Sequence, residues 1–222
     1  YFISTNETGN SKGKYRHANF SNQVGEDSKN VESNINELKT LNGLNDITFM
    51  NQTHSNTVIE ASKECTHLDC DAMFTEDKTI SCAVLTADCI PILVTESSGR
   101  MIGCIHAGWR GLQSKIIENF FSKFKSISKS NFRVLLGPCI SAQNYEVSDE
   151  IFSQFSKHSE RFRKNKSGNY YMDLRYIACD ILNELGITNV TISKSCTYND
   201  NFYSYRKDKI TGRFVSLIWF KK

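Results

Sequence analysis

Three side chains with metal-binding or nucleophilic chemistry follow apolar stretches of the chain: His54, Cys89 and His106. His54 lies in a polar loop, Cys89 follows Leu85-Thr-Ala-Asp88, and His106 follows Cys104-Ile105. Two imidazoles and one thiolate form a ligand set suited to Zn²⁺, and three protein ligands leave a fourth position open, as in catalytic zinc sites. No pair of the three lies at a short motif interval, so spacing alone also fits three residues buried for unrelated reasons.

The same three residues permit two other chemistries. Two imidazoles and a thiolate are also the ligand set of blue-copper sites, which add a weak axial methionine. A cysteine beside a histidine, oriented by Asp71 or Asp88, would form a nucleophilic pair. Asp88 directly precedes Cys89, and neighbouring strand residues point to opposite faces unless the strand has ended. Multi-copper clusters are disfavoured, because each consumes several imidazoles and the chain has five histidines.

Cationic and aromatic side chains close to these positions predict contacts to an anion or to a ring. Arg110 follows a tryptophan in the segment 106–111, and Arg206 follows Tyr205. A guanidinium is a planar bidentate donor for phosphate or carboxylate, although each arginine is also compatible with a stacked structural role. Tyr145 and Tyr205 are suited to stacking on a base or to filling the edge of the core.

The cysteines do not indicate a disulfide framework. The segment Cys65-Thr-His-Leu-Asp-Cys70 superficially resembles a metal knuckle but lacks a second cysteine pair at finger spacing, so we interpret it as a loop. Of the eight cysteines, Cys82, Cys104, Cys139 and Cys179 lie in apolar stretches, where a free thiol packs as a small hydrophobe. Without a visible secretory signal, we expect free thiols in a reducing cytoplasm.

Composition indicates a folded domain without a nucleic-acid or membrane partner. The chain has 222 residues, a net charge of +3 and a hydrophobic fraction of 39%, which are ordinary values for a globular protein. No basic stripe suggests nucleic acid, and no apolar run approaches the length of a membrane span. We expect one cytoplasmic domain over residues 1–222, monomeric or homodimeric, with residues 1–14 partly truncated or mobile.

Hydrophobic periodicity predicts the elements that position these side chains. Strands are expected at 1–3, 47–50, 57–59, 72–74, 80–86, 90–94, 101–105, 132–136, 190–192 and 214–218, and helices at 28–42, 112–125, 147–155 and 174–185. The segment 97–99 predicts a hairpin turn, Asp173 a helix N-cap, and Gly43 and Gly186 helix stops. The charged segment 157–168 is expected to be a loop. These elements predict a mixed α/β (α+β) domain.

Several short motifs occur together in a fixed order along the chain. They are Gln52-Thr-His54, Asp71-Ala72, Thr86-Ala-Asp-Cys89, His106-Ala-Gly-Trp-Arg-Gly111, Gly137-Pro-Cys-Ile140, Tyr145-Glu-Val147, Asp173-Leu174, Cys196-Thr197 and Tyr203-Ser-Tyr-Arg206 through Thr211-Gly-Arg213. This combination resembles the YfiH-like family, often labelled as polyphenol oxidase or laccase domains. The similarity runs from about residue 15 to residue 222, nearly the whole chain.

The resemblance implies a layered α/β/β/α fold with mixed sheets. It implies a Zn²⁺ site, rather than a copper site, formed by His54, Cys89 and His106. It also implies that purine nucleosides and phosphate are the substrates: phosphorolysis of adenosine, inosine and methylthioadenosine, with some adenosine deamination.

On this hypothesis Arg110 and Arg206 position phosphate, Tyr205 contacts the substrate, and Asp71 or Asp88 is the candidate carboxylate for proton transfer. Other members of the family edit peptidoglycan precursors in the cytoplasm, hydrolysing an amide of a UDP-muramyl-serine. Amide hydrolysis at the same three residues is therefore the alternative. A metal- or nucleotide-binding protein without turnover is a third interpretation.

Overall fold

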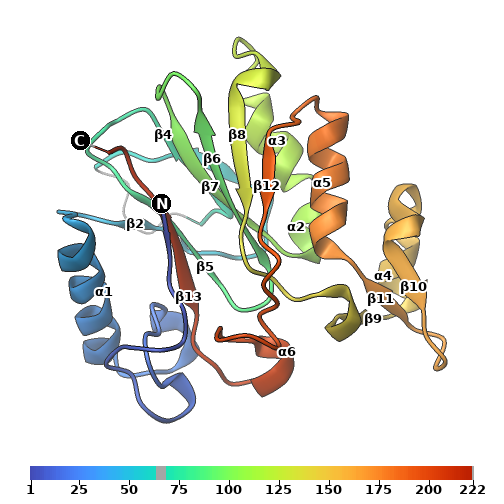
Figure 1. The fold of residues 1–222 in the computed structure, drawn as a ribbon, viewed down its shortest axis with the longest axis horizontal. Coiled ribbons are helices and arrows are strands. Elements are labelled where there is room, and N and C mark those ends of the chain that lie inside the picture. Colours follow the sequence, from blue (N-terminus) through green and yellow to red (C-terminus); the bar gives the residue numbers. More distant parts are fainter. Residues whose placement is uncertain (64–68, 222) are drawn as a thin grey trace.

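The protein is described by a computed structural model that places residues 1–63 and 69–221 (Figure 1). Two sheets lie face to face between helices. The first has the strand order β1-β13-β5-β2, and the second has the order β12-β8-β6-β7-β4-β3. The strands are β1 (Phe2–Ile3), β2 (Thr48–Phe49), β3 (Val58–Glu60), β4 (Ala72–Thr75), β5 (Cys82–Thr86), β6 (Ile90–Glu96), β7 (Ile102–Ala107), β8 (Phe132–Leu136), β12 (Val190–Ile192) and β13 (Phe214–Ile218).

Helices cover the outer faces of both sheets, which confirms the α/β/β/α layering. The longer helices are α1 (Ser28–Asn42), α2 (Trp109–Gln113), α3 (Ile116–Ser122) and α5 (Leu174–Glu184). Leu38 of α1 packs on Val215 of the first sheet, and Val84 packs between the sheets with Leu93. Figure 1 shows α1 on one side of the sheets and α2, α3 and α5 on the other. The sequence pattern predicted which face of each helix is buried, because each helix carries one apolar stripe.

The predicted helix 112–125 is two helices in the structure. Lys115, between α2 and α3, has a φ of 69° and lies in the left-handed region. The left-handed conformation interrupts the regular helix, and α3 begins at the next residue. The apolar face survives the break, since Ile116 and Phe120 are fully buried against the six-stranded sheet. Periodicity alone missed the break because both helices bury the same side.

The segment 157–168 is not the loop that its charge predicted. It contains the 3₁₀ helix η5 (Ser156–Arg161) and strand β10 (Phe162–Lys164) of a third sheet with β11 (Tyr170–Met172) and β9 (Glu146–Val147). Phe152, on the short helix α4 (Asp149–Ser153), stacks on the Tyr170 ring at 4.0 Å between centroids. Aromatic packing therefore orders a segment whose charged residues point outward. This small unit lies at the end of the molecule far from α1 (Figure 1).

The remaining elements are short. They are η1 (Gly13–Tyr15), η2 (Asn22–Val24), η3 (Lys129–Asn131), η4 (Ala142–Asn144) and α6 (Tyr205–Asp208). The Asp173 side chain accepts a hydrogen bond from the Tyr176 N–H, and Gly43 ends α1 with a φ of 63°. Both caps are as predicted.

Within the described residues no helix is long and apolar enough to cross a lipid bilayer. The described cysteines, which exclude Cys65, are all free thiols, in agreement with the sequence. The proposed Cys65–Cys70 loop lies mostly outside the described residues.

Candidate metal centre

The strand register brings Cys89 beside His106. Strands β6 and β7 are antiparallel and pair Pro91 with His106, so Cys89, two residues before Pro91, lies diagonally across from His106 near the end of β7. The loop between β2 and β3 adds His54, whose ring centroid is 4.8 Å from that of His106. The donor atoms of the three residues all lie within 4.8 Å of one another. The structure thus brings together the three residues that the sequence singled out.

Hydrogen bonds from the Gln52 side chain to the backbone of β5 anchor the loop that carries His54. The Gln52 amide donates to the Leu85 carbonyl at 2.7 Å and accepts from the Leu85 N–H at 2.8 Å. His54 itself has a φ of 60°, so its backbone turns sharply after this anchor. This turn places the His54 imidazole beside the start of β6 and the end of β7.

Asp71 lies behind the centre and connects its two histidines. Its fully buried carboxylate accepts hydrogen bonds from the N–H groups of Thr53 and His54, at 3.2 and 3.0 Å. Its Oδ1 also lies 2.7 Å from Nδ1 of His106. Burial alone would raise the pKa of Asp71, but the His106 hydrogen bond and charge lower it below its usual value. This contact leaves Nε2 of His106 for the cavity, as in histidine ligands held by a carboxylate.

The Cys89 thiol loses its proton at a lower pH than an ordinary cysteine. Burial would raise its pKa, but the His106 and His54 imidazoles outweigh burial and lower the pKa to about 6. Burial likewise opposes the charge on His106, yet the Cys89 thiolate and the Asp71 carboxylate raise its pKa to about 9. A thiolate is the form of cysteine that binds metals and attacks electrophiles.

Gly108, at the start of α2, makes room for the thiolate. A Cβ at this position would lie 2.8 Å from the Cys89 sulfur. The Gly108 backbone has a φ of −85°, which any residue adopts, so the close approach of sulfur explains the glycine. In the motif around His106, the glycine at position 108 is therefore required by its contact with the Cys89 sulfur rather than by its backbone conformation.

The donor set fits one metal ion. Two imidazoles and one thiolate at this separation suit Zn²⁺ with an open fourth position. A second group, His158, Glu160 and Asp180, does not fit a cation, because Asp180 accepts two hydrogen bonds from Arg161 at 2.6 and 2.7 Å. With two histidines at the centre, the described residues supply too few imidazoles for a multi-copper cluster.

The three donors open into a cavity of about 820 Å³. Tyr145, Tyr205, Arg110 and Arg206 line it, together with apolar residues such as Phe49. The guanidinium carbon of Arg110 lies 4.4 Å from the centroid of the Trp109 ring, so the predicted stacked pair exists beside the metal centre. Trp109 packs against the core cluster under α2.

Arg206 and Asp88 are tied into the cavity wall. The Arg206 side chain lies over the Tyr145 ring at 4.8 Å and donates to the Glu146 carbonyl at 2.8 Å. Strand β5 ends at Thr86 and Asp88 has a φ of 103°, so strand alternation does not apply to it. Its carboxylate accepts from the Thr197 hydroxyl and from the Arg206 N–H, both at 2.6 Å, and thereby holds the start of α6.

Two cationic residues of the cavity were not predicted from the sequence. Lys209 and Arg213 line the same cavity as the metal centre. Arg213 belongs to the motif Thr211-Gly-Arg213, which contributed to the family resemblance but did not indicate a function for Arg213.

The sequence profile of the family described as "Multi-copper polyphenol oxidoreductase laccase" matches residues 1–221. A protein from Haemophilus influenzae named "Purine nucleoside phosphorylase" is 34% identical over 229 residues, covering 99% of this chain and 93% of the relative. "Purine nucleoside phosphorylase YfiH" from Escherichia coli is 32% identical, covering 97% and 91% of the two chains. The crystal structure of Neisseria meningitidis protein NMB0706 is 33% identical with a TM-score of 0.93, covering 99% and 93%.

Proposed function

The chain belongs to the family described as multi-copper polyphenol oxidoreductase laccase, and we propose that it is a zinc-dependent purine nucleoside phosphorylase. The observation that carries the proposal is the His54, Cys89 and His106 group in a cavity lined by arginines and tyrosines. The names of its relatives support the reaction. The substrates would be adenosine, inosine and methylthioadenosine with phosphate, and adenosine deamination would be a side activity.

In phosphorolysis, a phosphate oxygen forms a bond to C1′ of the ribose while the bond from C1′ to the purine nitrogen breaks. Arg110 and Arg206 would hold the phosphate against C1′, since a guanidinium binds two oxygens at once. Most of the acceleration would come from this positioning and from charge stabilisation. Tyr145 and Tyr205 would stack on the purine and align it for departure.

His54, Cys89 and His106 would hold the metal ion. When bound, Zn²⁺ supplies Lewis-acid polarisation of a substrate oxygen. Asp71 would act as a positioning residue, because it lies behind His106 and fixes which imidazole nitrogen faces the cavity. Asp88 would keep α6 and Arg206 in place through the two hydrogen bonds that it accepts.

Amide hydrolysis is a second candidate, favoured by one observation. Cys89, His106 and Asp71 are arranged in the order of a nucleophile, a base and an orienting acid. A thiolate with a pKa of about 6 would attack an amide carbonyl, such as that of a wrongly built UDP-muramyl-serine. In this reaction the amide C–N bond breaks and water then releases the acyl group from sulfur.

One experiment ranks the two candidates. The purified protein is incubated with inosine, with and without phosphate, and separately with UDP-muramyl-serine, and products are separated by chromatography. Phosphorolysis predicts hypoxanthine and ribose 1-phosphate only when phosphate is present, and loss of both in Cys89→Ala and His106→Ala. Cleavage of the muramyl amide without action on inosine would support the second candidate instead. Incubation with adenosine tests the side activity through formation of inosine.

A further inference from the structure

The cavity beside the candidate metal centre carries an excess of positive charge. Among the described residues that line it, Arg110, Arg206, Lys209 and Arg213 are cationic, whereas the Asp88 carboxylate and the Cys89 thiolate are anionic. A free phosphate carries a charge of about −1.5 to −2 at neutral pH, if it titrates like a phosphate monoester. Bound metal would add further positive charge. A ligand with a second anionic group would match this cavity better than a neutral nucleoside.

The cations fall into two groups around Cys89. One group surrounds Tyr145, whose neighbouring charges include Arg206 and Arg110. The other lies beside Tyr205: the Lys209 ammonium lies 5.6 Å from the Tyr205 ring centroid, and Arg213 lines the same cavity as both residues. Cys89 is a neighbour of both Tyr145 and Arg213. We call the second group, Lys209 and Arg213, the Arg213 wall.

Arg213 is held in place by hydrogen bonds rather than by a contact ion pair with a described residue. Its Nη1 donates to the carbonyls of Thr211 and Gly212, at 3.0 and 2.9 Å. Its backbone N–H donates to the Asn19 side chain at 2.8 Å, which fixes the base of the residue. Within the described part of the chain it forms no ion pair, and its other guanidinium nitrogens make no hydrogen bond to protein. Cys89 and Asp88 are its anionic neighbours, but neither makes a contact ion pair with it. An anionic ligand that contacts the guanidinium would add charge-assisted hydrogen bonds and be stabilising there.

We infer that the Arg213 wall is a second anion subsite, which binds the phosphate of a nucleoside 5′-monophosphate whose base and sugar occupy the proposed substrate cavity. This inference rests on the proposed function for the placement of the nucleoside. Phosphate attacks C1′ from the face opposite the purine, whereas the 5′ carbon lies on the same face as the purine. A 5′-phosphate therefore points away from the attacking phosphate, toward a different group of cations. The cavity volume of about 820 Å³ leaves room for the added group, since ligand pockets span about 300–1,000 Å³.

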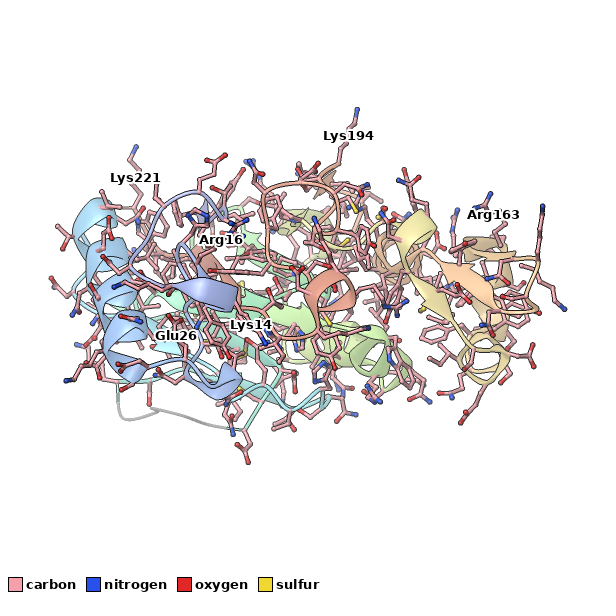
Figure 2. All side chains as sticks on the ribbon, turned by 90° about the horizontal axis from the view of Figure 1, so that it is seen from below. Lys14, Arg16, Glu26, Arg163, Lys194 and Lys221 are labelled. Atoms are coloured by element: carbon pink, nitrogen blue, oxygen red, sulfur yellow. The ribbon has the colours of Figure 1, made fainter. Side chains whose placement is uncertain are left out.

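The test compares the binding of adenosine 5′-monophosphate and adenosine by isothermal titration calorimetry. The wild-type protein should bind the monophosphate at least fivefold more tightly than adenosine. In Arg213→Gln the ratio of the two affinities should fall close to one, and Arg213→Lys should restore part of it. The matched control is Arg163→Gln, because Arg163 projects from β10 at the far end of the molecule from α1 (Figure 2). This control should leave both affinities unchanged.

A second variant tests the Arg213 wall independently, in case Arg213→Gln does not fold. Lys209 is exposed and follows the short helix α6, and Lys209→Gln should lower the monophosphate affinity about threefold without changing the melting temperature. Equal affinities for the two ligands in the wild type would overturn the inference. So would Arg213→Gln or Lys209→Gln variants that weaken inorganic phosphate as much as the monophosphate, since the wall would then hold the co-substrate. Binding does not require turnover, so failure of inosine phosphorolysis would reject the proposed function and leave this result standing.

Discussion

Asp71 is the residue on which the geometry of the metal centre depends most. It accepts hydrogen bonds from the loop that carries His54 and from the His106 ring, so one carboxylate sets the position of both imidazoles. The sequence singled out Asp71 as an acid near the site but left open whether Asp71 or Asp88 served the histidine. Only the pairing of Ala72 with Ile105 across β4 and β7 places Asp71 against His106.

We expect Asp71→Asn to lower zinc affinity about 10- to 100-fold, which is typical for the loss of a carboxylate behind a histidine ligand. The amide keeps the shape but removes the charge that favours the correct form of His106. Competition titration with a chromogenic chelator measures the affinity. Asp46→Asn is the matched control, because Asp46 is 88% exposed and pairs only with Lys39 at the surface. Zinc affinity equal to wild type in Asp71→Asn would contradict the positioning role.

The protonation of Cys89 provides a pH-dependent prediction for metal-free protein. With a pKa of about 6, the thiol is mostly thiolate at pH 7 and becomes protonated as the pH falls through 6. Alkylation of Cys89 by iodoacetamide should therefore stay fast down to about pH 6 and then slow tenfold per pH unit. Cys139, whose pKa burial raises to about 12, should remain unlabelled. Peptide mass spectrometry separates the two, and a Cys89 midpoint near pH 9 would refute the prediction.

Arg213 shows the limit of sequence reasoning at this scale. Its partners are backbone carbonyls of its own loop and the Asn19 side chain nearly two hundred residues away, so no local pattern predicted its place. The metal ligands were different. The residue types of His54, Cys89 and His106 suggested a metal, and the family resemblance implied that the three form one site. Spacing alone would not have chosen between zinc, copper and a nucleophilic pair.

At the scale of elements, the start of α2 limits the space for the thiolate. Gly108→Ala should displace the Cys89 sulfur, which would lie 2.8 Å from the new Cβ, and lower zinc affinity by at least about tenfold. Gly111→Ala in the same helix is the control, because its Cβ meets Ile116 at 3.3 Å and does not approach the thiolate. Zinc content after dialysis against chelator distinguishes them. Full zinc retention in Gly108→Ala would show that the sulfur moves freely.

The break between α2 and α3 predicts a stabilising substitution. Lys115 has a φ of 69°, where a side chain costs about 1–2 kcal/mol and glycine costs little. Lys115→Gly should raise the free energy of unfolding by about 0.5–1 kcal/mol, after the greater freedom of glycine in the unfolded chain is subtracted. Lys123→Gly, where φ is −68°, should instead lower it. Urea denaturation measures both, and the same sign for the two variants would argue against strain at Lys115.

Most strands and the cores of α1, α3 and α5 could be predicted, because each element buries one face with regular period. The break at Lys115 and strand β10 could not, for a shared physical reason. The charged strand β10 is ordered by the ring contacts of Phe152 with Tyr170 and Phe162. The lysine lies at a break whose two flanking helices are both packed into the core through Leu112 and Ile116. Tertiary packing therefore overrode local propensity in these two elements.

At the scale of the whole molecule, two sheets and α6 jointly build the cavity. The loop between β2 and β3, the segment between β5 and β6, and the end of β7 supply the candidate metal centre, while α6 and the segment before β13 supply Arg206, Lys209 and Arg213. These parts are far apart in sequence but adjacent in the fold, since β13 pairs with β5 and Phe214 lies opposite Thr86. The cavity therefore requires the folded domain rather than any single motif.

Zinc titration against turnover tests the central claim most directly. Protein freed of metal with a chelator is mixed with increasing zinc, and the rate of inosine phosphorolysis is recorded with phosphate present. The account predicts a rate that rises with zinc and saturates at one zinc per chain, with no recovery in Cys89→Ser. Full turnover in the metal-free protein, or zinc-restored turnover in Cys89→Ser, would contradict it.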